Sequence, residues 1–252
     1  MTLLVNKGAV ARAFGRAAGH YEQHAELQRR CGDALLALAP PVASGGDLLD
    51  AGCGTGWYSR LWQQRGQRVV ALDLSPQMLQ QARSLDAASS YLAGDIDALP
   101  LANQSVDCVW SNLAVQWSSD LRTALQQFAR VLRAEGVMLF STLLAGSLQE
   151  VHDAWRPLGA GEHANRFLTE AQVRAAGAGL NLRFIRQTQV MHFPSALSAM
   201  RSLKGIGATH LHQGRDGTPL TRQRLTQLEA LWPRDAQGYR LTYQLLFGVT
   251  QR

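Results

Sequence analysis

The middle of the chain alternates between short apolar runs and amphipathic segments. Apolar runs that predict buried strands cover residues 48–51, 68–73, 91–93, 106–110 and 136–143. Between them, apolar residues at helical spacing predict helices at residues 57–65, 76–85 and 121–132. Repeated strand–helix units favour a parallel sheet with helices on both faces and right-handed crossovers. The expected fold class is therefore α/β.

The N-terminal segment precedes this alternation and has its own pattern. Residues 22–38 carry apolar side chains at helical spacing, and Pro40-Pro41 follows as a stop signal. We therefore expect a single amphipathic helix here, and a helical cap over residues 1–43.

The C-terminal part predicts helices around residues 148–158 and 169–177, followed by long strands at 182–193 and 241–250. An insertion of about 45 residues separates these last two strands, and segments of that length are usually lids or binding elements. We expect helices within it near residues 195–204 and 221–232. The predicted organisation is a cap (1–43), a core (44–193 and 239–252) and a lid (194–238).

Composition limits the class of protein. The chain has 252 residues, of which 46% are hydrophobic and 17% charged, as in a globular protein with one large core. No apolar run reaches the roughly 18 residues that a membrane helix needs, and the first twenty residues lack a signal-peptide core. Three widely spaced cysteines predict neither a disulfide framework nor a zinc cluster. We expect a cytoplasmic protein without a membrane association.

The charge balance is basic, with a formal net charge of +6 and a pI near 9.7. Arginine supplies nearly all of it, because Lys7 and Lys204 are the only lysines. No Lys/Arg block or basic-aromatic run indicates nucleic acid. An acidic partner or an anionic substrate fits the excess better.

A glycine turn, DAGCGTG at residues 50–56, follows the first predicted strand. In open parallel sheets, ligands lie beyond the carboxyl ends of the strands, where glycine lets the backbone approach them. The nicotinamide fingerprint is G-x-G-x-x-G, whereas this turn reads D-x-G-x-G-x-G, and its leading acid would repel a pyrophosphate. A cofactor with a cationic amino-acid part would tolerate that acid.

The turn resembles the first motif of class I methyltransferases, which use S-adenosylmethionine. That resemblance implies a Rossmann-like, seven-stranded, mostly parallel sheet, and further strand ends match in order. It implies that Asp73 accepts the ribose hydroxyls and that the other cofactor contacts come from Asp50, Gly52, Gly54, Gly56, Leu74, Met78, Asp95, Ile96, Asn112 and Leu113. Taken singly, Asp73 could cap a helix, Met78 could be helix core and Asp95 could hold a turn.

A closer resemblance covers nearly the whole chain. The runs DLSPQML (73–79) and SNLAVQW (111–117), together with NKGAVARAFGRAAGHYEQHAELQ (6–28), HANRFL (163–168) and ALSAMRSLKGIGATHLH (196–212), resemble the malonyl-[acyl-carrier protein] O-methyltransferase family of biotin synthesis. The resemblance implies methylation of the free carboxylate of a malonyl thioester, on a carrier protein or coenzyme A, giving S-adenosylhomocysteine. It also implies an acidic acyl carrier protein as partner.

The acceptor chemistry predicts orienting groups and no general base. A carboxylate is already ionised near pH 7, so the protein must supply proximity, alignment and exclusion of water. Arg201 is the first candidate to hold the substrate carboxylate, and Lys204 lies on the same helical face. Tyr21 and Trp117 are candidates to close over the methyl donor. All four could instead be ordinary surface charges or core aromatics.

Histidines and arginines complete the candidate residues. We expect a structural or thioester-contacting role for His163, and no metal site, because His210 and His212 lack partnering carboxylates. A cationic rim is expected to steer the carrier, formed by Arg12, Arg16, Arg29, Arg30, Arg215, Arg222 and Arg224. Two alternatives remain open: methyl transfer to a quinone or other small metabolite, and a non-catalytic S-adenosylmethionine-binding or RNA-associated protein.

Overall fold

The computed structural model describes residues 5–42, 44–159, 164–206 and 221–250. Its strands are β1 (Asp47–Ala51), β2 (Arg68–Asp73), β3 (Ser90–Ala93), β4 (Val106–Ser111), β5 (Leu132–Leu143), β6 (Leu182–Phe193), β7 (Arg234–Asp235) and β8 (Gly238–Thr250). They form one sheet in the order β3-β2-β1-β4-β5-β8-β6, and β7 pairs with β8 outside this path. Neighbouring strands from β3 to β5 are parallel, whereas β8 is antiparallel to both β5 and β6. The predicted seven-stranded, mostly parallel sheet is confirmed, with β7 as an unpredicted addition.

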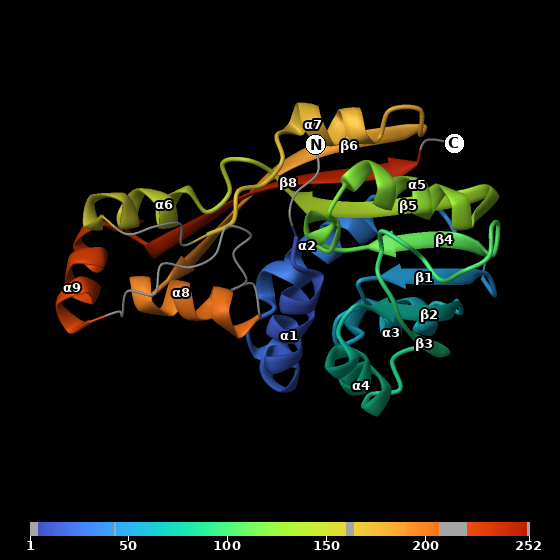
Figure 1. Cartoon of the computed structure of the whole chain (residues 1–252), viewed down its shortest axis with the longest axis horizontal. Coiled ribbons are helices and arrows are strands. Elements are labelled where there is room, and N and C mark those ends of the chain that lie inside the picture. The colour runs from blue at the N-terminus through green and yellow to red at the C-terminus, as the bar shows by residue number, and fades with distance from the viewer. Residues whose placement is uncertain (1–4, 43, 160–163, 207–220, 251–252) are drawn as a thin grey trace.

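The helices lie on both faces of this sheet and around its far end (Figure 1). They are α1 (Lys7–Ala17), α2 (Glu26–Ala37), α3 (Trp57–Gln64), α4 (Pro76–Ser84), α5 (Leu121–Val131), α6 (Gln149–Trp155), α7 (Glu170–Ala176), α8 (Ala196–Gly205) and α9 (Arg222–Leu231). Short 3₁₀ helices η1 (Ala18–Gln23), η2 (Val115–Trp117) and η3 (Arg156–Leu158) connect some of them. No helix in these ranges is long and apolar enough to cross a membrane.

Alternating strand residues supply the core on the two faces of the sheet. Leu48 packs in one buried cluster with side chains of α2 and α3, while its neighbour Leu49 packs in another with side chains of α5. In α5, Leu121, Leu125 and Phe128 recur at helical spacing and are all buried. Burial of each such side chain contributes roughly 2 kcal/mol. The parallel part of the sheet is therefore covered on both sides.

The N-terminal segment differs from the single helix predicted at residues 22–38. It contains α1, then η1, and only then α2, which begins at Glu26. The helical path is interrupted at His24, whose φ of −120° is not helical. Just before this break, Tyr21 and Glu22 face a cavity beside β1. The helix predicted at residues 22–38 is confirmed as α2, but it begins four residues later and ends one residue earlier, and the residues before it form η1.

The long strands β6 and β8 project away from the parallel part of the sheet (Figure 1). Between them in sequence lie α8, α9 and β7, at the position where the insertion was predicted. At this end α8 packs on β6, β8 and η1, and α6 packs on α9 and β8. Helix α8 is thereby placed beside the N-terminal segment, and α9 packs on α6 and α8. A lid function for residues 194–238, and the division into cap, core and lid, stay predictions.

Candidate active site

The glycine turn between β1 and α3 is shaped by backbone conformations that favour glycine. Gly52 has φ +84° and Gly56 has φ +83°. A Cβ added at Gly52 would stand 2.3 Å from the Cβ of Ala114, and one at Gly56 would stand 2.5 Å from that of Ala87. At Gly54, also with positive φ, no atom lies within 4 Å of such a Cβ. Gly52 and Gly56 are therefore tightly packed, whereas Gly54, in the middle of the turn, faces open space.

Asp73, the last residue of β2, is tied to this turn. Its Oδ2 accepts a hydrogen bond from the backbone N–H of Gly54 at 2.9 Å, and its Oδ1 accepts one from Ser75 at 2.7 Å. Ser75 itself caps α4, since its side chain accepts from the N–H of Met78. Burial raises the pKa of Asp73, while the backbone donors oppose that rise. Asp73 is thus an oriented acceptor at the strand end and is not the helix cap.

A cavity of ≈ 640 Å³, counting its open mouth, lies over these strand ends and is called cavity A. Most of the predicted cofactor residues line it, including Asp73, Met78 and Asn112. The other predicted residues that line it are Gly52, Gly54, Leu74, Asp95, Ile96 and Leu113, whereas Gly56 is not on its wall and packs against Ala87 and Ala82. Met78 is 1% exposed, so it serves the core and the cavity together. Cavity A has the apolar walls and the placed carboxylates that could hold a nucleoside.

Lys7 also lines cavity A and was not predicted to do so. Its Nζ lies 2.7 Å from Oδ1 of Asp95 and 2.8 Å from Oδ2 of Asp97. These contacts fasten the start of α1 across the end of β3. Asp95 also accepts from the N–H of Asp97, as in an ordinary turn. Asp95, which was predicted to contact the adenine, is therefore ion-paired with a lysine from the N-terminal helix.

Asp50 lines a second space, cavity B, of ≈ 420 Å³ including its mouth. Asp50 is 2% exposed, and the hydroxyl of Ser59 donates to its Oδ2 at 2.6 Å. Burial raises the pKa of Asp50 to about 7; the Ser59 hydrogen bond opposes this, and the nearby Asp73 adds to it. Glu22, Arg29 and Thr55 lie on the wall of the same cavity. The wall of cavity B therefore combines acidic side chains with a single arginine.

A hydrogen-bond chain after β4 orients Asn112. The N–H of Leu113 donates to Ser141 Oγ at 2.9 Å, and Ser141 Oγ donates to Asn112 Oδ1 at 2.8 Å. Asn112 Nδ2 then donates to the carbonyl of Gln28 in α2 at 2.9 Å. Leu113 has φ +49°, a strained conformation for a residue with a branched side chain. Such a conformation persists where surrounding contacts fix the backbone. At Leu113 it directs the chain toward cavity A.

A third and larger space, cavity C, adjoins the other two and encloses ≈ 2280 Å³ including its mouth. Tyr21 lines all three cavities, and Trp117 lines A and C. Burial raises the pKa of Tyr21, so its phenol is protonated at neutral pH and is no base there. Trp117 meets Phe14 edge-on with ring centroids 5.4 Å apart. These aromatic residues stand between the cofactor-type cavity and the larger one.

Arg201 and Lys204 of α8 both line cavity C. Their side chains are solvent-exposed, and within the described ranges neither has a carboxylate at salt-bridge distance. The remaining wall is largely apolar and includes Met200, Leu203 and Trp155. The cavity can therefore offer two free cations to an anionic group at the end of an otherwise apolar ligand.

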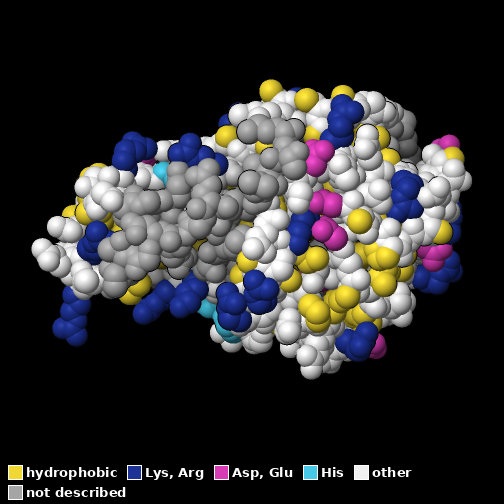
Figure 2. Space-filling model, in the orientation of Figure 1, with side chains coloured by type: hydrophobic (Ala, Val, Ile, Leu, Met, Phe, Trp, Pro, Cys, Tyr) yellow, Lys and Arg dark blue, Asp and Glu magenta, His cyan; other side chains and the backbone are white. Residues whose placement is uncertain are grey.

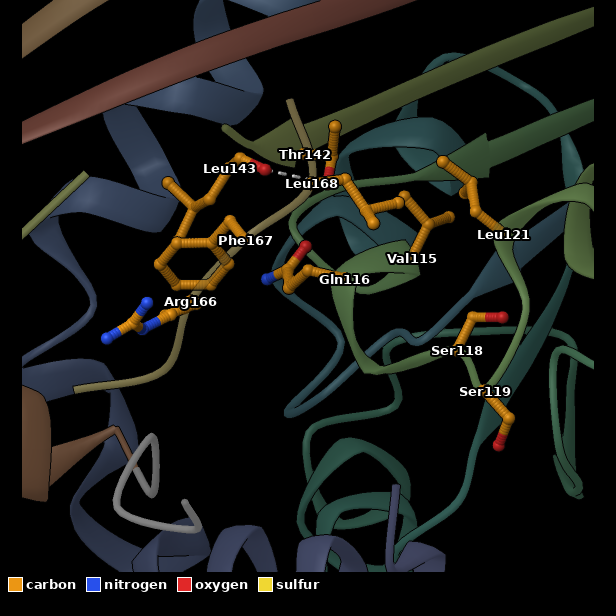
Figure 3. Close-up of a pocket in the computed structure, with 10 residues that line it drawn as sticks. All are labelled: Val115, Gln116, Ser118, Ser119, Leu121, Thr142, Leu143, Arg166, Phe167 and Leu168. Carbon is orange, nitrogen blue, oxygen red and sulfur yellow. Dashed lines mark hydrogen bonds between the residues drawn. The ribbon is translucent and has the colours of Figure 1, made fainter. Parts of the chain in front are cut away.

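A side pocket of ≈ 370 Å³ opens beside cavity C and shares Gln116, Leu143 and Phe167 with it. Figure 3 shows Gln116 projecting toward Phe167, with Arg166 nearby and Ser118 and Ser119 farther along the wall. Gln116 Nε2 donates to the carbonyl of Leu113 at 2.6 Å, while its buried Oε1 has no hydrogen-bond partner among the residues that the structure describes. The side pocket thus extends cavity C past the loop that follows β4.

Some of the predicted residues lie on the cavity walls, and others lie outside the described residues. Asp50, Asp73 and Asn112 share one connected site with Tyr21 and Trp117, and Arg201 and Lys204 lie on the wall of the adjoining cavity. His163, His210, His212 and Arg215 lie outside the described residues. Among the described residues, no group of three potential metal ligands comes together.

Known proteins match this chain in sequence and in fold. A family model described as "Methyltransferase domain" matches residues 49–140. The YcgJ protein of Bacillus subtilis has a similar structure with a TM-score of 0.59 at 18% identity, covering 88% of this chain and 98% of that one. Geranyl diphosphate C-methyltransferase of Streptomyces coelicolor A3(2), solved with S-adenosyl-L-homocysteine, has a TM-score of 0.53 at 16% identity, covering 87% of this chain and 78% of that one. The solved structures confirm the Rossmann-like methyltransferase fold, and the family model indicates a class I methyltransferase.

Curated relatives narrow the class to a family. A protein of Erwinia pyrifoliae named malonyl-[acyl-carrier protein] O-methyltransferase is 54% identical over 100% of this chain and 96% of its own length. Proteins of the same name from Salmonella typhimurium and Serratia marcescens are 53% and 50% identical, each over 98% of this chain and at least 97% of their own lengths. The chain belongs to the malonyl-[acyl-carrier protein] O-methyltransferase family. It is a S-adenosylmethionine-dependent O-methyltransferase.

Proposed function

We propose that this enzyme methylates the free carboxylate of a malonyl thioester carried by an acyl carrier protein, an early step of biotin synthesis. The single observation that carries the proposal is cavity C, which adjoins cavity A through Tyr21, Leu113 and Trp117 and presents Arg201 and Lys204. Family membership supports the same substrate. A quinone acceptor would leave these two cations without a partner.

The proposed cofactor contacts follow from the site. Asp73 would accept the ribose hydroxyls, while Leu74, Met78, Asp95 and Ile96 would surround the adenine in cavity A. The glycine turn and Asp50 would face the methionyl part in cavity B. When bound, S-adenosylmethionine supplies an electrophilic methyl group on a sulfonium. The chain's own residues bind, orient and exclude water.

The methyl transfer needs no proton acceptor. One carboxylate oxygen forms the new C–O bond to the methyl carbon, the methyl–sulfur bond breaks, and its electron pair stays on sulfur. The negative carboxylate and positive sulfonium both become neutral, so a dry site favours the transition state over the separated ions. Arg201 would hold the other carboxylate oxygen, and Tyr21 and Trp117 would keep water from the reacting atoms.

The test is mass spectrometry of malonyl-carrier incubated with S-adenosylmethionine and the enzyme. The expected product is heavier by one methyl group, and its ester is removed by mild base. Arg201→Ala should lower kcat/KM roughly 10- to 100-fold, because a charge-assisted hydrogen bond contributes about 1.5–3 kcal/mol. Arg201→Lys should lie between the two, since lysine keeps the charge but not the fork.

Arg83→Ala is the matched control, because Arg83 is an exposed arginine of α4 outside all three cavities. Its rate should equal that of the wild type. A wild-type enzyme that leaves malonyl-carrier unmodified while methylating a quinone would overturn the proposal. An unaffected Arg201→Ala variant would remove only the role given to Arg201. Malonyl-coenzyme A in parallel reactions measures the contribution of the carrier.

A further inference from the structure

Cavity B contains an ion pair that the sequence did not connect with the cofactor. Arg29 of α2 was expected on the outer rim that steers the carrier, yet it lines cavity B with Asp50, Gly52 and Gly54. The side chains of Arg29 and Glu22 are 30% and 34% exposed, which is less than a free surface pair. Arg29 is the only cationic residue among the described residues that line this cavity. This position indicates that Arg29 binds a group inside cavity B.

Several contacts hold the Arg29 guanidinium in place. Its Nη1 donates at 2.9 Å both to the backbone carbonyl of Glu22 and to Glu22 Oε2. The guanidinium carbon lies 5.3 Å from the ring centroid of Trp57, a cation–π contact. Arginine loses little freedom on binding a ligand when its fork is already oriented. The arginine is therefore preorganised on the cavity wall.

The free side of the fork is available to a ligand. Within the described part of the chain, Nη2 and Nε of Arg29 make no hydrogen bond, and neither atom is buried. Two adjacent guanidinium N–H groups match the two oxygens of a carboxylate. Glu22 holds the opposite side of the fork, and its other oxygen accepts a hydrogen bond from the hydroxyl of Thr55. The pair is thus anchored to the glycine turn itself.

Charge balance identifies the ligand group. This inference rests on the proposed function: with the nucleoside in cavity A beside Asp73 and the glycine turn, the other end of S-adenosylmethionine would enter cavity B. That end is an amino acid, with one ammonium and one carboxylate. Asp50 and Glu22 supply hydrogen-bond acceptors for the ammonium. The carboxylate needs a cation, and Arg29 is the only cationic residue that lines cavity B among the described residues.

We propose that Arg29 binds the α-carboxylate of S-adenosylmethionine through Nη2 and Nε, and that Glu22 positions the arginine and faces the cofactor ammonium. The N-terminal segment then contributes directly to the cofactor site. It also excludes Arg29 from the carrier-steering residues. Cofactor fragments that lack the carboxylate should lose this contact, whereas the nucleoside contacts of cavity A are unaffected.

The test pairs a protein change with a ligand change. Isothermal titration calorimetry measures the Kd of S-adenosylmethionine and of its decarboxylated analogue, which keeps the amine and the sulfonium. For Arg29→Met, binding of S-adenosylmethionine should weaken roughly 10- to 100-fold, as for a charge-assisted hydrogen bond. Binding of the decarboxylated analogue should change by less than about threefold, because that ligand has no carboxylate to lose.

Arg30→Met is the matched control, since Arg30 is the adjacent arginine, is exposed and pairs with Glu26 on the same helix. It should bind both ligands like the wild type. Equal weakening of both ligands by Arg29→Met, or weakening of neither, would overturn the proposal. If Arg29→Met does not fold, Arg29→Lys gives the same comparison, with selective but smaller weakening of S-adenosylmethionine expected. No acceptor is present, so the result is independent of the malonyl assignment.

Discussion

Asp50 and Asp47 lie on the same strand but have opposite electrostatic environments. Burial raises the pKa of Asp50 to about 7. Asp47 begins β1 and is paired with Arg68 and Arg133; the Arg68 hydrogen bond is the main cause that lowers its pKa. A raised acid pKa means that the folded state holds a proton which the unfolded state releases. The two carboxylates should therefore affect stability in opposite directions as pH rises.

Asp50→Asn should stabilise the cofactor-free protein increasingly as pH rises from about 4 to about 7. Over this window the wild type loses stability, because ionising Asp50 becomes costlier in the folded than in the unfolded state. Raising the pKa of Asp50 to about 7 corresponds to an upper limit of roughly 4 kcal/mol in the free energy of unfolding. Urea unfolding of both proteins at pH 5 and pH 8 measures the difference, which should be larger at pH 8.

Asp47→Asn serves as the control with the opposite sign. Its ion pairs stabilise the folded protein above the unfolded pKa and are lost as pH falls. The variant should therefore be less stable than the wild type at pH 8, with a gap that narrows in acid. A pH-independent gap for Asp50→Asn would contradict the raised pKa. A buried acid in a cofactor site thus lowers the free energy of unfolding of the cofactor-free protein near neutral pH.

The sequence could place some candidate residues beside the cavities because their signal is local. The glycine turn and Asp73 come from a short spacing after two strands, and the hydrogen bond from Gly54 to Asp73 joins them directly. Lys7, Glu22 and Arg29 have no such signal. They reach the cavities through tertiary contacts of the N-terminal segment, such as those of Lys7 with Asp95 and of Glu22 with Thr55, which helical periodicity does not encode. Helical periodicity did predict α2, but not the four-residue delay of its start at Glu26.

At the scale of elements, α8 meets the N-terminal segment through a glycine. A Cβ added at Gly205 would stand 2.1 Å from Cδ2 of His24, next to η1. This close approach places Arg201 and Lys204, on the same helix, along the wall of cavity C. The strand order was predictable from alternating apolar runs, but this helix-to-helix contact depends on one missing side chain.

Gly205→Ala should lower kcat/KM for malonyl-carrier roughly 10- to 100-fold, because displacement of α8 misplaces the carboxylate-holding residues. The Kd of S-adenosylmethionine should change by less than about threefold. Removing the obstructing ring with a second substitution, His24→Ala, should restore much of the rate. Gly19→Ala is the control, since no atom lies within 4 Å of a Cβ added there. A Gly205→Ala enzyme with normal kinetics would show that α8 does not position the acceptor.

For the whole molecule, the structure divides the arginines that the sequence had grouped into one rim. Arg29 lines cavity B, Arg30 pairs with Glu26, and Arg215 lies outside the described residues. Arg12, Arg16 and Arg222 remain exposed, and Arg16 lines cavity C. Figure 2 shows several Lys and Arg side chains along the lower edge of this face, in the region of α8 and α1, and others along its upper edge. The net charge of +6 follows from composition, whereas this separation depends on how the chain folds.

The exposed arginines should accelerate the encounter with an acidic carrier protein. Electrostatic steering raises association rates by 10- to 1000-fold at low salt, and it fades as the Debye length falls from about 10 Å at 0.1 M to about 3 Å at 1 M. The kcat/KM for malonyl-carrier should therefore fall about tenfold between 50 mM and 500 mM salt. Malonyl-pantetheine has no protein surface to attract, so its kcat/KM should change by less than about twofold.

Charge reversal tests which surface does the steering. Arg12→Glu combined with Arg222→Glu should reduce kcat/KM for malonyl-carrier at low salt and flatten its salt dependence, while malonyl-pantetheine reacts at the wild-type rate. Arg83→Glu removes the same type of charge from α4, away from α8 and α9 in Figure 1, and should behave like the wild type apart from the general change in net charge. Equal losses in the two charge-reversed enzymes would mean that overall charge, rather than the face beside cavity C, attracts the carrier. A steep salt dependence that persists after Arg12 and Arg222 are reversed would assign the steering to other residues.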